Sequence, residues 1–168
     1  MHDDLINREA HHLYAEHPET AEGRRLSREL ARLRHAERLQ ADRAVRASGL
    51  SAIDLTALRY LVHAQREEQD VSPKDLIVLL GSTSATVTNI VERLVRRSLV
   101  TRTDHPTDRR GHFLVPTDGA VELVHRVFEG HHEAVVRAID RLDPSAAGAA
   151  AEAIGRIADS LDRLHGGA

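Results

Sequence analysis

Apolar positions recur with a helical period over most of this chain and with a strand-like period over one short stretch. Between residues 21 and 47, Leu26, Leu30, Leu33 and Ala36 follow one another at intervals of three or four residues among charged side chains. This pattern predicts an amphipathic helix of roughly 25 residues. A helix of that length extends past a small globular core, so we expect it to pack against a partner.

A second helix is predicted from Ser51, and its apolar positions indicate a place in the core. Leu55, Leu58, Leu61 and Val62 lie three or four residues apart or adjacent, as on the buried side of a helix.

Two shorter helices joined by a glycine turn are predicted next. Ser72 precedes Pro73, and Asp75 completes a Ser-x-x-Asp capping box, so the first of these helices begins at Pro73 and ends at Gly81. Thr83 caps the second helix. Its apolar face comprises Val87, Ile90, Val91 and Leu94, and its other face comprises Ala85, Thr86, Asn89, Arg93 and Arg96. Two helices connected in this way are typical of a helix-turn-helix.

Two β-favouring runs, residues 99–103 and 112–115, follow the helix-turn-helix. The connection between them contains Asp108, Arg109 and Arg110 and ends in a glycine. A hairpin at this place is predicted to be a wing, because its arginines can enter a flanking minor groove.

Both ends of the chain are predicted to contribute to a dimer. A long helix is expected from Thr117 to about Leu142, and an alanine-rich helix from Pro144. Since few aromatic residues are present to fill a monomer core, these helices are better buried between two subunits. We expect a mainly α fold of the α+β winged-helix type. Its parts are an N-terminal arm (1–20), a dimerisation helix (21–50), a winged helix-turn-helix DNA-binding lobe (51–116) and C-terminal dimerisation helices (117–168).

Basic and acidic residues are segregated along the chain, so the net charge of −3 conceals two strongly basic segments. Residues 93–110 contain six arginines against two aspartates, and residues 24–46 contain eight arginines against three acidic residues. Basic segments on an acidic body favour contact with DNA phosphates. For residues 24–46, a solvated helix face explains the arginines equally well.

The amino-acid composition excludes several classes of protein. The absence of Cys excludes disulfides, cysteine-ligated zinc and thiol redox switching. No apolar run approaches a membrane span and the start of the chain does not resemble a signal peptide, so we expect a cytoplasmic protein without membrane contact. No nucleophilic triad, phosphate-binding glycine loop or nucleotide fingerprint is present, so we expect neither an enzyme nor a cofactor.

The helix capped by Thr83 carries the side chains expected to read DNA, because small hydroxyls and an amide at a helix N-terminus can reach base edges. The expected DNA-binding residues are Thr83, Ser84, Thr86, Thr88, Asn89, Arg93, Arg109 and Arg110. Among them, Arg93 is assigned to the phosphate backbone. Arg109 or Arg110 is assigned to the minor groove, with Asp108 orienting the wing.

In their order and register, these motifs resemble those of the MarR family of bacterial winged-helix transcription regulators. The motifs are the run from Ser84 to Leu94, Leu99-Val100 with Arg102, Asp108-Arg109-Arg110, and Thr117-Asp118-Gly119. The resemblance extends from about Leu26 to the C-terminus. It implies an obligate homodimer with interleaved terminal helices, two recognition helices on a pseudopalindromic double-stranded operator, and a small-molecule pocket.

Three positions depart from the family pattern. Ser98 stands where the family usually has Gly, Pro116 replaces the usual leucine before Thr117, and Ser82 replaces an apolar residue in the turn. We expect strain or a different shape at the turn into the hairpin, one lost backbone donor at the strand end, and weaker local packing.

Two further sites are candidates. Pocket residues drawn from the first, second and fifth helices would include His35, Arg59, Tyr60 and His63. A metal-ligand set, for which a solvated stripe beside the apolar face is the favoured alternative, has spacings of three, four and three: Glu122, His125, Glu129 and His132.

The function expected from the sequence is that of a homodimeric, sequence-specific transcriptional regulator, a repressor released by a small-molecule inducer. One alternative is a metal-responsive regulator of the same fold. Another is a winged-helix protein-interaction module without specific DNA binding.

Overall fold

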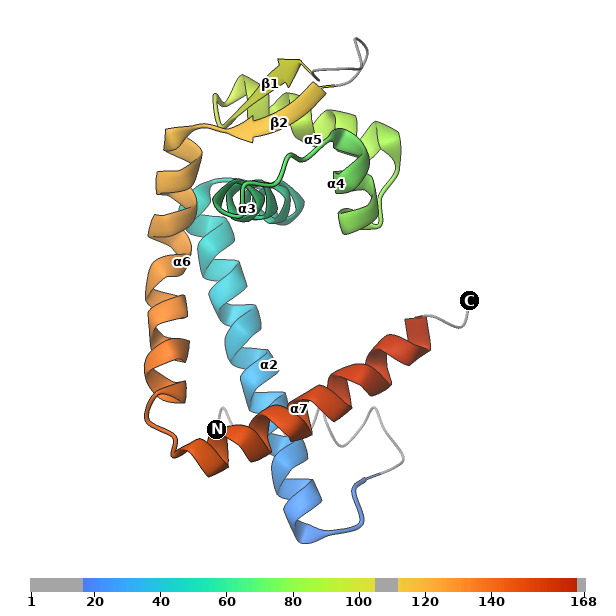
Figure 1. Ribbon diagram of the computed structural model, residues 1–168, viewed down its shortest axis with the longest axis vertical. Coiled ribbons are helices and arrows are strands. Elements are labelled where there is room, and N and C mark those ends of the chain that lie inside the picture. The colour runs from blue at the N-terminus through green and yellow to red at the C-terminus, as the bar shows by residue number, and fades with distance from the viewer. Residues whose placement is uncertain (1–16, 105–111, 166–168) are drawn as a thin grey trace. The chain divides into compact units, whose positions relative to one another are not determined.

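The computed structural model describes residues 17–104 and 112–165 (Figure 1). Its elements follow the predicted order: α2 (Ala21–Ser48), α3 (Ala52–Arg66), α4 (Pro73–Leu80), α5 (Ser84–Arg96), β1 (Val100–Asp104), β2 (His112–Pro116), α6 (Asp118–Ile139) and α7 (Pro144–His165). The mainly helical winged-helix class is therefore confirmed. The chain divides into two compact units, Met1–Val127 and Phe128–Ala168, with the boundary inside α6.

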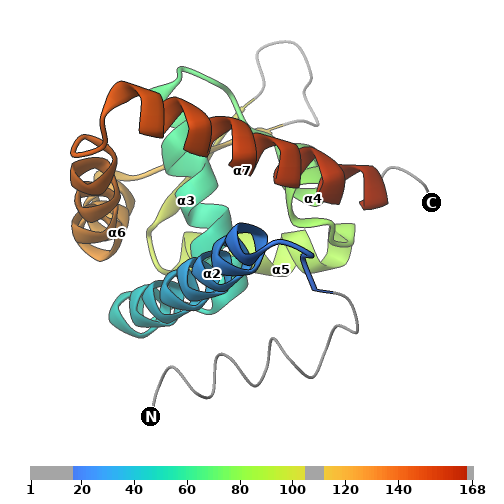
Figure 2. The same ribbon diagram turned by 90° about the horizontal axis from the view of Figure 1, so that it is seen from below.

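α3 forms the centre of the first unit and contacts α2, α4, α5 and β2. Figure 1 views α3 end-on beneath the hairpin, and Figure 2 shows it along its length. The side chains that are at most 2% exposed come from α2, α3, α4, α5, β1 and the start of α6 (Asp118–Ile139): Ala44, Ala57, Leu58, Leu61, Val62, Leu76, Val87, Ile90, Val91, Leu94, Val100 and Ala120. The core thus joins the helix-turn-helix to α3 and to the hairpin.

Local capping explains where the helices of the helix-turn-helix begin and end. The Asp75 carboxylate accepts hydrogen bonds from the backbone nitrogen and the hydroxyl of Ser72, both at 2.8 Å, which confirms the predicted capping box. These bonds, led by the backbone one, lower the pKa of Asp75. Gly81 ends α4 with φ of +54°, a conformation that glycine adopts without steric cost. Thr83 caps α5 by accepting from the Thr86 nitrogen.

The turn from α5 into the hairpin has the hydrogen bonds of a Schellman motif. Ser98 donates its backbone N–H to the Val95 carbonyl, and Leu99 donates to the Leu94 carbonyl. The central position of this motif requires a left-handed backbone, and Ser98 adopts it with φ of +55°. The strain expected from a serine in place of glycine is therefore present.

The wing is a two-stranded antiparallel hairpin in which Val100 pairs with Pro116 and Arg102 pairs with Leu114. Hydrogen bonds at two places connect the hairpin to the rest of the unit. Leu114 donates its N–H to the carbonyl of Val71, which precedes α4, and Thr117 donates its hydroxyl to the Ser98 carbonyl.

The second unit contains the end of α6 and all of α7. α6 ends at Ile139 and not near Leu142 as expected. The reason is Asp143, whose carboxylate accepts from the backbone nitrogens of Ser145 and Ala146 and caps α7, while Pro144 disfavours a helical residue before it. None of the described helices is long and apolar enough to cross a bilayer.

Candidate nucleic-acid interface

α5 buries one side and exposes a polar side, as the spacing predicted. Val87, Ile90, Val91 and Leu94 are at most 1% exposed. On the other side, Ser84, Thr88 and Asn89 are exposed and Thr86 is half-buried. Because the buried side is packed against the core, the exposed side chains are presented from a rigid helix.

The polar side chains of this helix differ in how much of their hydrogen-bonding capacity the fold uses. Thr83 accepts from the Thr86 nitrogen, and the two threonine hydroxyls lie 3.0 Å apart. Thr88 donates its hydroxyl to the Ser84 carbonyl at 2.9 Å, which leaves the hydroxyl oxygen as an acceptor. Asn89 makes no side-chain hydrogen bond within residues 17–104 and 112–165, so its amide can both donate and accept.

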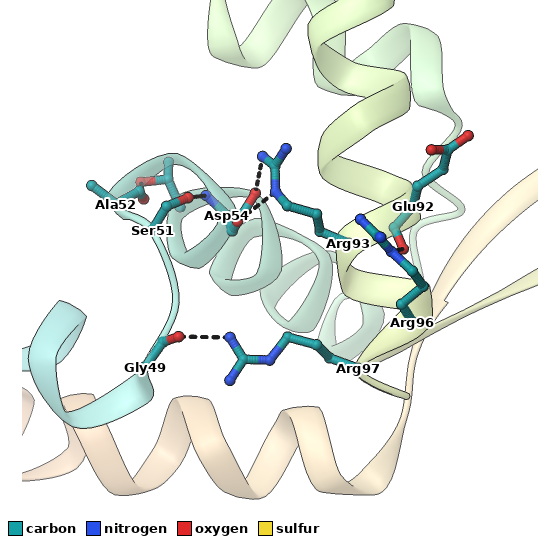
Figure 3. Close-up of polar contacts among 9 residues, drawn as sticks. Gly49, Ser51, Ala52, Asp54, Glu92, Arg93, Arg96 and Arg97 are labelled. Carbon is teal, nitrogen blue, oxygen red and sulfur yellow. Dashed lines mark hydrogen bonds and ion pairs between the residues drawn. The ribbon is translucent and has the colours of Figure 1, made fainter.

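Arg93 is held by a carboxylate that sequence reasoning did not assign. Its Nε and Nη2 donate to the two carboxylate oxygens of Asp54, at 3.0 and 2.6 Å (Figure 3). The Asp54 side chain is 6% exposed, whereas that of Arg93 is 40% exposed. The bonds to Asp54 raise the pKa of the Arg93 guanidinium. Arg93 thus fastens the recognition helix to the start of α3.

Arg97 makes a second connection between α5 and the region where α3 begins. It caps the C-terminus of α5, and its Nη1 donates to the carbonyl of Gly49, between α2 and α3, at 2.6 Å. Figure 3 shows Arg93 and Arg97 extending in the same direction, toward α3 and the α2–α3 turn. The sequence identified Arg97 only as part of a basic run, because its partner is a backbone atom 48 residues away.

A shallow, open hollow of about 260 Å³ lies where the last turns of α5 meet β1. Its lining residues are Glu92, Val95, Arg96 and Arg102. The Nε of Arg96 donates to the Glu92 carbonyl at 3.4 Å, so this arginine lies along its own helix (Figure 3). Two guanidinium groups and one carboxylate give the hollow a net positive charge.

Three predicted wing residues, Asp108, Arg109 and Arg110, lie outside the described residues. Their roles remain predictions. The candidate pocket residues are described: His35 and Tyr60 are half-buried on α2 and α3, and Arg59 and His63 are exposed on α3. None of the four lines the hollow beside β1.

The proposed metal ligands do not form a site. No group of three His, Asp or Glu side chains that could hold a metal ion occurs in the described part of the chain, which includes Glu122, His125, Glu129 and His132. The physical reason is helix geometry, because seven residues of rise put Glu122 and Glu129 about 10 Å apart along the axis. In addition, the His125 ring contacts Arg66 of α3.

Known proteins share this arrangement of helices and hairpin. The model of the MarR family matches residues 48–111. Staphylococcus aureus MepR bound to ethidium bromide is 20% identical over 80% of this chain and 95% of that chain, with a TM-score of 0.63. The S. aureus MepR–DNA complex is 20% identical over 77% and 94%, with a TM-score of 0.55. The transcriptional regulator Tm0710 from Thermotoga maritima is 24% identical over 85% and 98%, with a TM-score of 0.56. No curated protein sequence matches the chain.

Together, the helix-turn-helix, the following hairpin and the flanking helices define a winged helix-turn-helix protein. The family match covers α3, α4, α5 and β1 and ends before β2, and the solved structures share the fold. Residues 48–111 therefore match the MarR family, and the chain shares the fold of the solved structures of MepR and Tm0710.

Proposed function

We propose that this protein is a homodimeric, sequence-specific DNA-binding transcriptional regulator that represses in the cytoplasm until a small molecule releases it. The observation that carries the proposal is the exposed polar side of α5. Ser84, Thr86, Thr88 and Asn89 contact bases or nearby phosphates in the major groove, and Thr83 caps the helix that carries them. Arg109 or Arg110 of the wing enters the minor groove, and Asp108 orients it.

Arg93 keeps its assignment to the phosphate backbone within this proposal. Its salt bridge with Asp54 uses Nε and Nη2, and a phosphate contact would use Nη1. A guanidinium can serve both because its five N–H donors point in different directions.

Dimerisation is supported by apolar side chains that the single chain leaves exposed. They occur on α2 in the first unit and on α6 and α7 in the second: Leu26, Leu33, Leu39, Val135, Val136, Ile139, Ile154, Leu161 and Leu164. Burial of these side chains between two subunits would remove them from water. Two recognition helices would then bind half-sites about one helical turn of DNA apart.

Release by a small molecule is supported by the related fold of MepR, whose structures include one with ethidium bromide and one with DNA. We assign the corresponding pocket in this chain to His35, Arg59, Tyr60 and His63. An inducer bound there changes the spacing of the two recognition helices and lowers operator affinity.

A binding titration tests the proposed function. Fluorescence anisotropy with duplexes from the region upstream of the protein's own gene should show saturable binding that survives an excess of unrelated competitor DNA. Binding should weaken steeply as salt is raised, because phosphate contacts release counterions. Absence of binding to every promoter duplex at low salt would favour the alternative of a protein-interaction module.

A further inference from the structure

The hollow between α5 and β1 places two arginines beside each other from different elements. Arg96 comes from the recognition helix and Arg102 from the first wing strand, and both line the hollow. Among the residues that the structure describes, neither guanidinium takes part in a salt bridge. In contrast, the neighbouring Arg93 and Arg97 are bound to Asp54 and Gly49.

Arg96 shares the DNA-facing side of α5. It follows Asn89 by seven residues, which is close to two helical turns, so both lie on the side opposite Ile90 and Leu94. Arg96 is therefore placed further along the same face that presents Asn89.

Arg102 lies on the side of the hairpin that faces α5. It is paired with Leu114, which is 3% exposed, and it follows the buried Val100 by two residues. Paired residues and residues two apart share one side of a hairpin. The side chain of Arg102 therefore extends the inner side of the wing toward the hollow.

The geometry of double-stranded DNA indicates which ligand would occupy this hollow. A major groove and its flanking minor groove are separated by one phosphate backbone. A protein that inserts a helix into the first groove and a wing into the second must straddle that backbone, which then passes between helix and wing. The hollow is the space between these two elements.

We propose that Arg96 and Arg102 together bind a backbone phosphodiester of the operator between the two grooves. The inference rests on the proposed function. Guanidinium groups suit this ligand because their planar donors match phosphate oxygens and keep their charge at every physiological pH. Glu92, in the same hollow, opposes the phosphate and limits the strength of the contact.

Measurements of DNA affinity at several salt concentrations, made on single variants, test this site. Arg96→Ala and Arg102→Ala should each weaken binding about tenfold on operator and unrelated DNA alike. Each should also lower the slope of log Kobs against log salt, and the double variant should lower it by about 0.9 per half-site, the value for one phosphate. The lysine variants should retain most of that slope because they retain the charge. Arg126→Ala, which removes an exposed arginine of α6, is the matched control and should change neither quantity.

Glu92→Gln should have the opposite effect. Removal of the carboxylate raises the positive charge of the hollow, so binding should become tighter on every sequence. Weaker binding by this variant would overturn the proposed opposition between Glu92 and the phosphate.

A neutral methylphosphonate, placed at one backbone position at a time, identifies the phosphate. At the position held by the two arginines it should weaken binding by the wild type and cause no further loss in the Arg96→Ala/Arg102→Ala variant. Unchanged affinity and salt slope in both alanine variants, with specific binding by the wild type intact, would overturn the phosphate site alone. Absence of DNA binding by the wild type would overturn the proposed function and this site together.

Inorganic phosphate is an alternative anion that presents the same oxygens to the two arginines as a DNA phosphodiester does. The DNA-free protein should show no saturable binding of inorganic phosphate by calorimetry. Binding that is lost in the double alanine variant would instead define a site for a free anion.

Discussion

Arg93 and Asp54 form a two-point salt bridge between the recognition helix and the start of α3, with distances of 2.6 and 3.0 Å. One turn further along, Arg97 bonds the carbonyl of Gly49. The orientation of α5 is therefore set by two directional contacts in addition to apolar packing. A change at the α2–α3 turn would be transmitted to α5 through the same contacts.

The first prediction concerns this salt bridge. Asp54→Asn removes a charge that cannot touch DNA, because Asp54 is buried beneath Arg93. If Arg93 acts by positioning α5, Asp54→Asn and Arg93→Ala should each weaken operator binding roughly five- to tenfold, and the double variant should be no weaker. Fluorescence anisotropy at several salt concentrations measures both the affinity and the salt slope.

The salt slope separates the two roles of Arg93. A phosphate contact by Arg93 predicts a lower slope for Arg93→Ala and an unchanged slope for Asp54→Asn. Asp42→Asn, the same chemical change at an exposed site on α2, is the control and should bind as the wild type does. Full operator affinity in Asp54→Asn would contradict the positioning role.

A second prediction concerns the strained turn at Ser98. Ser98→Gly should raise the free energy of unfolding by about 0.5–1 kcal/mol, because glycine accepts the positive φ without the clash of a Cβ atom. The gain is smaller than the full strain because glycine also increases the entropy of the unfolded chain. Urea denaturation followed by circular dichroism measures the change.

The equivalent turn after α4 supplies the reciprocal control. Gly81 has φ of +54°, and a Cβ atom added there would meet nothing within 4 Å. Gly81→Ser should therefore lower the free energy of unfolding by a similar amount through backbone strain alone. A loss of stability in Ser98→Gly would show that the serine is favoured there by contacts of its own.

Features set by neighbouring residues could be predicted from the sequence. The cap at Ser72 and Asp75, the glycine at position 81 and the apolar side of α5 all depend on residues within two turns of one another, and all three are present. The left-handed backbone at Ser98 was likewise signalled by a serine in a glycine position.

Contacts between distant residues could not be predicted in the same way. Asp54 completes a Ser-x-x-Asp pattern with Ser51, so local rules assign its carboxylate to a cap. The fold instead brings it to Arg93, 39 residues away, and only Ser51 performs the capping. The pairing of Arg96 with Arg102 around one hollow likewise depends on the packing of α5 against β1.

A third prediction tests base contact at the start of α5 with a matched pair of threonines. Thr88 and Thr56 each donate the hydroxyl to the carbonyl four residues earlier, at 2.9 Å, and both are exposed. Thr88→Ala should weaken operator binding, whereas Thr56→Ala on α3 should not, although both lose the same intrahelical bond. Equal affinities for the two variants would contradict a DNA contact by Thr88.

Asn89→Ala should alter the preference among operator sequences, since its amide is the side chain on this face best suited to two-point contact with a base edge. Selection of bound duplexes from a pool randomised at each half-site measures the preference. Equal losses on every sequence would assign Asn89 to the backbone.

Another prediction follows from the lowered pKa of Asp75. Its ionised form is stabilised by Ser72 in the folded state, so this stabilisation is complete above the ordinary pKa of 3.8 and is lost as pH falls through the lower folded value. Asp75→Asn should reduce the free energy of unfolding by about 0.5–1 kcal/mol near neutral pH. The difference from the wild type should vanish in acid.

Urea titrations at a series of pH values measure this difference. Ser72→Ala is a graded control, because it removes the hydroxyl donor and leaves the backbone donor to the carboxylate. It should show a smaller pH-dependent loss than Asp75→Asn. A difference that persists unchanged into strong acid would assign the stabilisation to something other than the carboxylate charge.

The last prediction concerns the exposed apolar side of α2. Leu26 and Leu33 are 43% and 49% exposed and lie seven residues apart, hence on one side of the helix. If that side is buried between subunits, Leu26→Glu/Leu33→Glu should reduce the mass found by light scattering from two chains to one. Operator affinity should fall about 100-fold, because the half-sites no longer bind a linked pair of recognition helices. Ser27→Glu, on the same helix, should remain dimeric, and a dimeric double variant would locate the subunit interface elsewhere.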